Sequence, residues 1–291
     1  ASLFRAMGNS KIAIFTALIM NVMNILGNII FIVGFHMGVE GSALSSLISR
    51  LFAAVVMLYL AHNRDNFVYL RHLLRFKLHG SMIQNILRIG VPNGLENGMF
   101  QIGKLMVQRI ITELGMAAIA ANAIVNSLTT IVSIPGTAIG LALLTIVGQC
   151  VGAHDFHQAT YYTNKLLKYS YVAMTLICAV VALFARQLVG VYGLTTPDAV
   201  HMAVEIIRYY AIFSIFIWIP AFTLPNALRA AGDARFSMTT SIISMWLFRI
   251  LFSFIFVYGF HLGLLGIWIA MFLDWVVRSI VFTIRYHTDA W

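Results

Sequence analysis

The chain contains eight apolar stretches that are each long enough to cross a lipid bilayer as a helix. The hydrocarbon core of a bilayer requires about 20 consecutive apolar residues. Of the 291 residues, 60% are hydrophobic and only 10% are charged, whereas soluble domains have about 25% charged residues. We therefore predict an all-α integral membrane protein with eight transmembrane helices and exclude a soluble enzyme, a disordered chain and a coiled coil. The predicted spans cover roughly residues 12–33, 41–61, 83–110, 117–148, 167–189, 203–225, 236–260 and 264–285.

The net charge of +9 is distributed as expected for a membrane protein, which argues against nucleic acid as a partner. The gaps 34–40, 112–116, 190–200 and 259–263 contain no lysine or arginine. By the positive-inside rule, the basic gaps lie in the cytoplasm, and we expect a multi-pass protein of the plasma membrane. The basic residues of the other gaps and their flanks are Arg5, Lys11, Arg64, Arg71, Arg75, Lys77, Arg88, Lys165, Lys168, Arg229, Arg235 and Arg285.

Two segments near the N-terminus recur near the C-terminus. The sequence FRAMGNSK at 4–11 matches LRAAGDAR at 228–235, and GFHMGVEG at 34–41 matches GFHLGLLG at 259–266. An even number of spans separates the copies, so the repeat is parallel, as in many transporters. We predict that 1–62 holds the last two helices of an N-terminal lobe and that 83–291 is a complete six-helix C-terminal lobe. Residues 63–82 form a basic cytoplasmic linker, and four helices are expected to precede Ala1.

These segments resemble the multidrug and toxic compound extrusion (MATE) family. The resemblance rests on LRAAGD at 228–233, GVP at 90–92 followed by Glu96, VGQCVGA at 147–153 and GIW at 266–268. It implies helices five to twelve of a twelve-helix antiporter whose two lobes form a V-shaped cleft. It also implies export of organic cations or other amphipathic toxins in exchange for Na⁺ or H⁺, with the lipid bilayer as the setting and no other cofactor or metal.

Polar residues form narrow stripes along the third and fourth predicted spans. Their spacing of three or four residues places them on one helix face, and polar groups that face lipid are costly. The stripes therefore predict either a shared hydrated cavity or hydrogen bonds between helices. The candidates on the third span are Asn93, Asn97, Gln101, Lys104 and Gln108, and those on the fourth are Asn122, Asn126, Thr129 and Ser133.

Glu96 lies at the edge of the first stripe and is the candidate for coupling to a cation or proton. A carboxylate at membrane depth can exchange a proton or bind Na⁺ with amide oxygens, which Asn93, Asn97 and Gln101 would supply. Na⁺-coupled members of the MATE family resemble this chain in having a glutamate in helix seven. They also have an acidic residue in helix ten, which the matching stretch 213–219 lacks. The alternative is a structural salt bridge from Glu96 to another helix.

Three charged residues in the last two spans are predicted to interact. Asp274 and Arg278 are spaced i, i+4, and Arg249 could join them, either as a buried structural ion network or as a gate. Tyr210 and Trp218 are candidates to stack on cationic substrates, although such residues also occur in ordinary packing.

The sequence leaves four functions open. The first is a secondary antiporter of the MATE type that exports xenobiotics or organic cations. The second is a related lipid or lipid-linked sugar flippase, which would need a wide basic cavity, whereas the stripes here are mostly neutral. The third, an intramembrane enzyme, lacks a cluster of acidic or histidine residues, so we expect no enzyme. The fourth is a non-functional fragment of the antiporter.

Overall fold

The computed structural model describes residues 4–5, 10–62, 80–193 and 196–288. Within these ranges every regular element is a helix, which confirms the all-α prediction. The chain divides into two compact units, Ala1–His79 and Gly80–Trp291. The first repeat motif at 4–11 and the basic linker at 63–82 fall largely outside the described residues.

The first unit is a pair of antiparallel helices. It consists of α2 (Ser10–Asn28), a π-helical extension η1 (Ile29–Gly34) and α3 (Gly38–Ala61). The helices approach closely where Gly27 faces Ser45, since a Cβ at Gly27 would lie 2.4 Å from the Ser45 hydroxyl oxygen. Polar contacts bridge the pair, because Ser45 donates to the Asn24 carbonyl at 2.8 Å and Asn24 Nδ2 donates to Ser49 Oγ at 3.4 Å.

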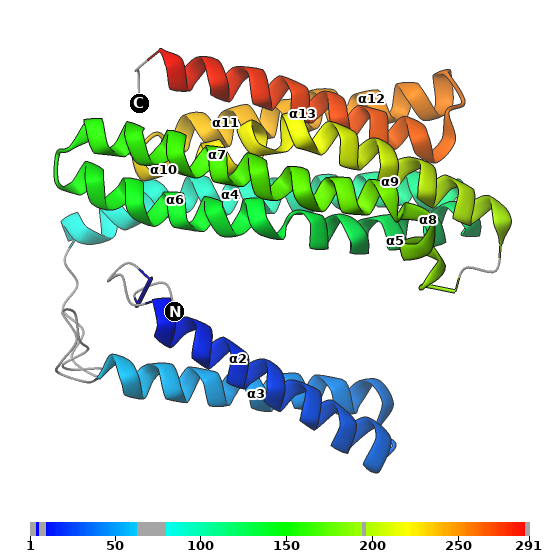
Figure 1. The fold of residues 1–291 in the computed structure, drawn as a ribbon, viewed down its shortest axis with the longest axis horizontal. Coiled ribbons are helices and arrows are strands. Elements are labelled where there is room, and N and C mark those ends of the chain that lie inside the picture. Colours follow the sequence, from blue (N-terminus) through cyan, green and yellow to red (C-terminus); the bar gives the residue numbers. More distant parts are fainter. Residues whose placement is uncertain (1–3, 6–9, 63–79, 194–195, 289–291) are drawn as a thin grey trace. The chain divides into compact units, whose positions relative to one another are not determined.

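The second unit is a bundle of helices that run back and forth along one long axis (Figure 1). The chain turns at one end of the bundle after α6 and after α10, and at the other end after α4, α8 and η4. The elements are α4 (Gly80–Glu113), α5 (Met116–Val132), α6 (Ile134–Gly152), α7 (Phe156–Leu183), α8 (Ala185–Gly190), α9 (Pro197–Trp218), η2 (Ile219–Thr223), α10 (Leu224–Ala230), α11 (Ala234–Ser244), η3 (Met245–Leu251), α12 (Phe252–Phe254), η4 (Ile255–Gly259) and α13 (Gly263–His287).

All eight predicted spans coincide with helical segments in the described part of the chain. Among the described residues, seven helical segments are both long and apolar enough to cross a membrane, and α5 is a shorter apolar helix. The predicted span 117–148 corresponds to α5 and α6 together. The predicted span 83–110 corresponds to α4, which is longer than the prediction and rich in polar residues. The basic gaps of the second unit gather at the end where α6 meets α7 and α10 meets α11 (Figure 1). Their cytoplasmic location remains a prediction.

Two prolines lie at breaks between helices of the second unit. Pro135 lacks the N–H that an unbroken helix needs, and α5 ends at Val132 before α6 begins at Ile134. Pro220 lies in the π-helical stretch η2, between α9 and α10. Such breaks are tolerated at membrane depth where protein or a cavity covers the freed backbone groups.

The repeated turn has the same backbone geometry in each unit. His36 and His261 adopt φ values of 52° and 53°, and Gly38 and Gly263 adopt 58° and 55°. A left-handed conformation is uncommon for a residue other than glycine, so its recurrence at equivalent histidines supports the predicted repeat.

The hydrogen bonds of the turn recur as well. The N–H of Met37 donates to the Phe31 carbonyl at 3.0 Å, and the N–H of Leu262 donates to the Phe256 carbonyl at 3.0 Å. A π-helical stretch precedes each turn. The offset that relates the two histidines also relates Asn24 to Arg249 and Ser49 to Asp274.

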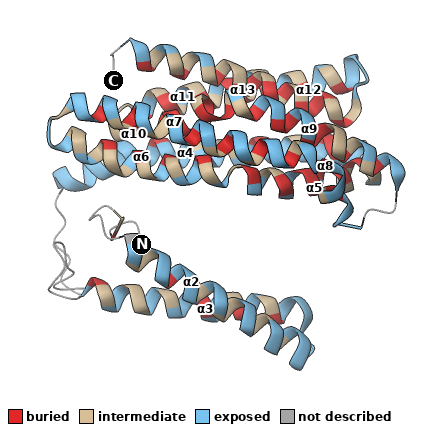
Figure 2. Cartoon of the chain, in the orientation of Figure 1, coloured by how far each residue is buried: buried red, intermediate tan, exposed pale blue. Residues whose placement is uncertain are grey.

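Buried residues of the second unit lie on the faces that the helices turn toward one another (Figure 2). The largest core cluster joins small and β-branched residues of α5, α7 and α9 to large aromatic residues of α13. Outward faces carry exposed large hydrophobic residues along most helices, as expected where acyl chains replace water. The core therefore fixes α5, α9 and α13 around the cavity described next.

Candidate functional site

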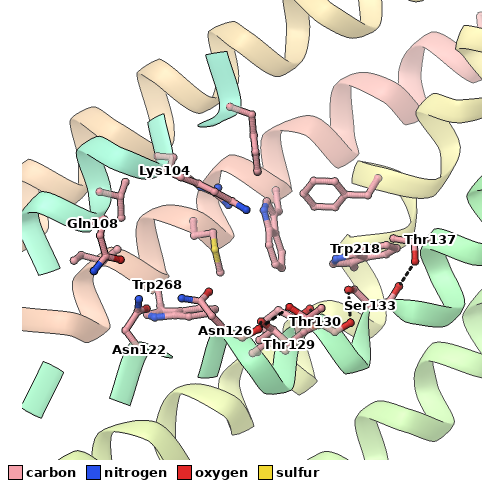
Figure 3. Close-up of a pocket in the computed structure, with 18 residues that line it drawn as sticks. Lys104, Gln108, Asn122, Asn126, Thr129, Thr130, Ser133, Thr137, Trp218 and Trp268 are labelled. Atoms are coloured by element: carbon pink, nitrogen blue, oxygen red, sulfur yellow. Dashed lines mark hydrogen bonds between the residues drawn. The ribbon is translucent and has the colours of Figure 1, made fainter. Parts of the chain in front are cut away.

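A cavity of about 550 Å³ lies within the second unit, between α4, α5, α9 and α13 (Figure 3). All eight residues predicted to line a cavity line this one: Lys104, Gln108, Asn122, Asn126, Thr129, Ser133, Tyr210 and Trp218. A cavity, rather than interhelical hydrogen bonds alone, therefore faces the two polar stripes. Its volume is that of a pocket for a drug-sized molecule.

The hydroxyl groups on the α5 side bond to their own helix. Thr129 donates to the Asn126 carbonyl at 3.0 Å, and Ser133 donates to the Thr130 carbonyl at 2.9 Å. Because their protons are used in this way, these hydroxyls retain only acceptor lone pairs for a ligand. This side of the cavity is polar and carries no charge.

Aromatic rings that the sequence analysis did not assign to the cavity make up another part of its wall. Phe222, Trp268 and Trp275 line it together with Tyr210. The Tyr210 ring packs edge-on against Trp268 and Trp275, with centroids 6.1 and 5.7 Å apart. These residues lie on α13 and η2. Their spacing along the chain does not show that they share a cavity, because this depends on how the two elements pack. Tyr210 and Trp218 thus both line the cavity and pack in the core.

Most residues of the cavity wall are uncharged, as the two stripes predicted, and its two charged residues are both basic. Lys104 and Arg249 both line it, and both lie over the ring of Phe100, at 5.1 and 5.3 Å from its centroid. Lys104 was a predicted cavity residue, whereas Arg249 was not, because it comes from η3, a third element. Phe100 itself was also missed, although it lies within the polar face of α4.

The predicted ion network is present and buried. Asp274 Oδ1 accepts a hydrogen bond from Arg278 Nε at 2.8 Å and one from Ser244 Oγ at 2.6 Å. Arg249 Nε lies 3.5 Å from Asp274 Oδ2. The exposed fractions of these side chains are 0% for Asp274, 3% for Arg278 and 7% for Arg249. One carboxylate is therefore the counterion of two buried guanidinium groups.

Glu96 forms a salt bridge with another helix, which was the structural alternative for this residue. Both of its carboxylate oxygens accept from Arg229 Nη2, at 2.6 and 2.8 Å. The pair is mostly buried, with 14% of Glu96 and 21% of Arg229 exposed. It lines a second cavity of about 200 Å³ together with Asn93 and Asn97.

Gln101 does not belong to the group around Glu96, contrary to the prediction. It lines neither cavity and is exposed. At about 100° per residue, Gln101 points roughly 140° away from Glu96 around the helix axis. Asn97 is close to Glu96 but its amide donates to the Asn93 carbonyl at 2.8 Å, which leaves its oxygen as a possible ligand.

Phe100 separates the two cavities. It lines both of them, with Lys104 on the side of the larger cavity and Glu96 on the side of the smaller one. Arg278, which lines the smaller cavity, lies 5.9 Å from the same ring. The arrangement offers a polar and aromatic chamber for an organic molecule beside a smaller chamber that contains an ion pair.

Comparison with known proteins shows which family of proteins has this architecture. Residues 92–255, more than half of the chain, match the MatE family. The chain is 27% identical to the uncharacterized transporter YisQ of Bacillus subtilis, covering 100% of this chain and 64% of YisQ. It is 26% identical to the probable multidrug resistance protein NorM of Thermotoga maritima, covering 100% of this chain and 63% of that protein.

The fold is also similar to that of solved structures. A MOP superfamily transporter from Pyrococcus furiosus, described as having a binding pocket of reverse polarity, superposes with a TM-score of 0.87 at 20% identity. The superposition covers 97% of this chain and 63% of the other. This chain thus spans just under two thirds of the length of these proteins. The match over 92–255 shows that the chain belongs to the MatE family.

Proposed function

We propose that this chain is part of a secondary active antiporter that exports amphipathic xenobiotics across the plasma membrane. The observation that carries the proposal is the cavity of about 550 Å³, which joins a polar wall on α5 to the aromatic rings of Tyr210, Trp218, Trp268 and Trp275. Such a surface binds flat organic molecules through ring stacking and burial of apolar area. The multidrug resistance relatives support the same function.

A lipid-linked sugar flippase remains the second candidate because it would need a basic cavity, and Lys104 and Arg249 supply positive charge. The size of the cavity favours a small molecule, since pockets of about 300–1,000 Å³ enclose drug-sized ligands. We therefore retain export of small amphipathic compounds as the first choice.

We further propose that Glu96 is the coupling carboxylate and that Arg229 competes with the coupling ion. In the structure Arg229 neutralises Glu96. A proton or Na⁺ that reaches the smaller cavity would take the place of this guanidinium, with oxygens of Asn93 or Asn97 as additional Na⁺ ligands. Loss of the salt bridge would release α4 from α10. Whether the ion is Na⁺ or H⁺ follows from the experiment below.

Export is tested by dye efflux from cells that make the whole protein carrying this chain. Thr129→Trp places a large ring in the cavity, whereas Ile131→Trp adds the same ring to the outer face of α5, where Ile131 is 52% exposed. We expect Thr129→Trp to abolish efflux and Ile131→Trp to retain it. Equal efflux by both variants, or efflux that survives collapse of all ion gradients, would contradict the proposal.

Coupling is tested in proteoliposomes in which Na⁺ and pH gradients are imposed separately. Glu96→Gln should remove the response to the coupling ion because a neutral amide cannot exchange that cation for Arg229. Glu113→Gln is the matched control, since Glu113 also forms an ion pair on α4, with Arg109 at 3.8 Å, but is exposed. If Glu96→Gln keeps the same gradient dependence as Glu113→Gln, Glu96 is not the coupling residue.

A further inference from the structure

We propose that the larger cavity binds a small aromatic acid, whose anionic group is held by Lys104 and Arg249. The inference rests on the proposed export function and names a substrate class for the same site. It departs from the organic cations that the family resemblance implies.

The charges that line the cavity are all positive. Lys104 and Arg249 are its only ionised lining residues, and no aspartate or glutamate is among the residues that line it in the described part of the chain. Glu96 lies beyond Phe100 in the smaller cavity and is neutralised by Arg229. A cationic ligand would meet two like charges with no carboxylate on the cavity wall, whereas an anion would meet two charges of opposite sign.

Neither cation has its charge fully balanced by the protein. Lys104 forms no salt bridge within the described ranges, and its recorded partner is the face of the Phe100 ring at 5.1 Å. Arg249 is buried, yet its 3.5 Å distance to Asp274 exceeds hydrogen-bond length, and Asp274 is already bonded to Arg278 and Ser244. A buried cation that shares its counterion is stabilised when an anion occupies the adjacent cavity.

Two aromatic residues of the same wall have buried N–H groups. The indole N–H groups of Trp268 and Trp275 have no hydrogen-bond acceptor among the described residues, although these residues are only 3% and 5% exposed. Because these nitrogen atoms have almost no accessible surface, they do not face the open cavity, and the anionic group is assigned to Lys104 and Arg249. In Figure 3 the Lys104 side chain extends into the cavity that Trp268 borders.

The aromatic rings of the wall favour an aromatic body for the part of the ligand that carries no charge. Trp218 and Phe222 line the cavity beside Trp275, and ring faces of this kind favour a flat aromatic body. A volume of about 550 Å³ accommodates such a body with an acidic group, within the range for drug-sized ligands. The site therefore favours a small aromatic acid over the headgroup of a lipid whose chains remain in the bilayer.

Binding is measured with the whole protein purified in a neutral detergent, by fluorescence polarisation of two dyes that share a xanthene core. Fluorescein is anionic and rhodamine 123 is cationic at pH 7.5. We expect fluorescein to bind at least about tenfold more tightly, which is the size of one charge-assisted hydrogen bond. Equal affinity, or preference for rhodamine 123, would overturn the inference.

Substitutions in α4 test whether the preference for fluorescein arises in the cavity. Lys104→Met keeps the length of the side chain but removes the charge, and should weaken fluorescein binding about tenfold. Arg109→Met is the control, because Arg109 lies on the same helix with 86% of its side chain exposed, and should leave binding unchanged. Lys104→Glu should reverse the preference between the dyes. Unchanged fluorescein binding in Lys104→Met would refute the role of Lys104.

Competition separates a soluble acid from a lipid. 2-Naphthoate should displace fluorescein, and phosphatidylglycerol added to the micelles should not; displacement by phosphatidylglycerol alone would overturn the choice of a small acid. The assay needs no ion gradient, so it is independent of export. Gradient-driven efflux of rhodamine 123 without fluorescein binding would refute this inference and leave the export function intact.

Discussion

Removing the charge of Asp274 should destabilise the second unit more than any other single neutralisation of a carboxylate there. Asp274 is fully buried and faces Arg278 and Arg249, whose exposed fractions are 3% and 7%. Asp274→Asn preserves the shape of the side chain but leaves two buried guanidinium groups without a counterion. Breaking a buried ion pair in this way costs about 3–5 kcal/mol. At roughly 2–4 °C per kcal/mol, the melting temperature should fall by roughly 10 °C.

The measurement is thermal unfolding of the purified protein in detergent, followed by tryptophan fluorescence. Asp233→Asn is the matched control because it also breaks an Asp–Arg pair, with Arg285 at 2.8 Å, but one whose side chains are 18% and 30% exposed. A pair this accessible contributes about 1 kcal/mol or less. If Asp274→Asn melts within 2 °C of the unaltered protein, or no lower than Asp233→Asn, the counterion role assigned to Asp274 is wrong.

Two further predictions concern close packing at glycine. Gly136→Ala should lower stability by about 1–3 kcal/mol, because its Cβ would lie 2.1 Å from the Trp218 ring; Gly148→Ala, where the added carbon meets nothing within 4 Å, should be neutral or stabilising, and equal melting temperatures would contradict this. Gly266→Ala and Gly41→Ala should each destabilise their turn, since both new Cβ atoms would lie 3.0 Å from a phenylalanine Cβ. Both predictions are tested by the loss of helical circular dichroism on heating. If only one of Gly266→Ala and Gly41→Ala is destabilising, the two turns differ and the second prediction is wrong.

Much of the fold follows from the sequence because bilayer thickness imposes a minimum apolar length on every span. Apolar length located the helices. The π-helical stretch Met245–Leu251 was not predicted, because it contains no proline and its extra residue per turn leaves no compositional signal. The charge pattern predicts which end of each span faces the cytoplasm, and this orientation stays a prediction.

The site was predictable only where its residues share a helix. Spacing along α4 and α5 identified the polar wall, because residues three or four apart lie on one face. The bond between Glu96 and Arg229 joins residues 133 positions apart, and the positions of Trp268 and Trp275 depend on how α13 packs. Phe100 was within reach of the same reasoning, since it lies 40° from Lys104 on a helical projection at 100° per residue, but an apolar residue does not stand out in a membrane helix.

The register that relates the two copies of the repeated turn has an electrostatic consequence. It superimposes Asn24 and Ser49, joined by a neutral hydrogen bond of 3.4 Å, on Arg249 and Asp274. At equivalent positions of the repeat, neutral dipoles therefore join the two helices of one copy, and full charges join those of the other. Protonation can remove the charge of a carboxylate but leaves amides and hydroxyls unaltered, so the two copies respond unequally to strong acid.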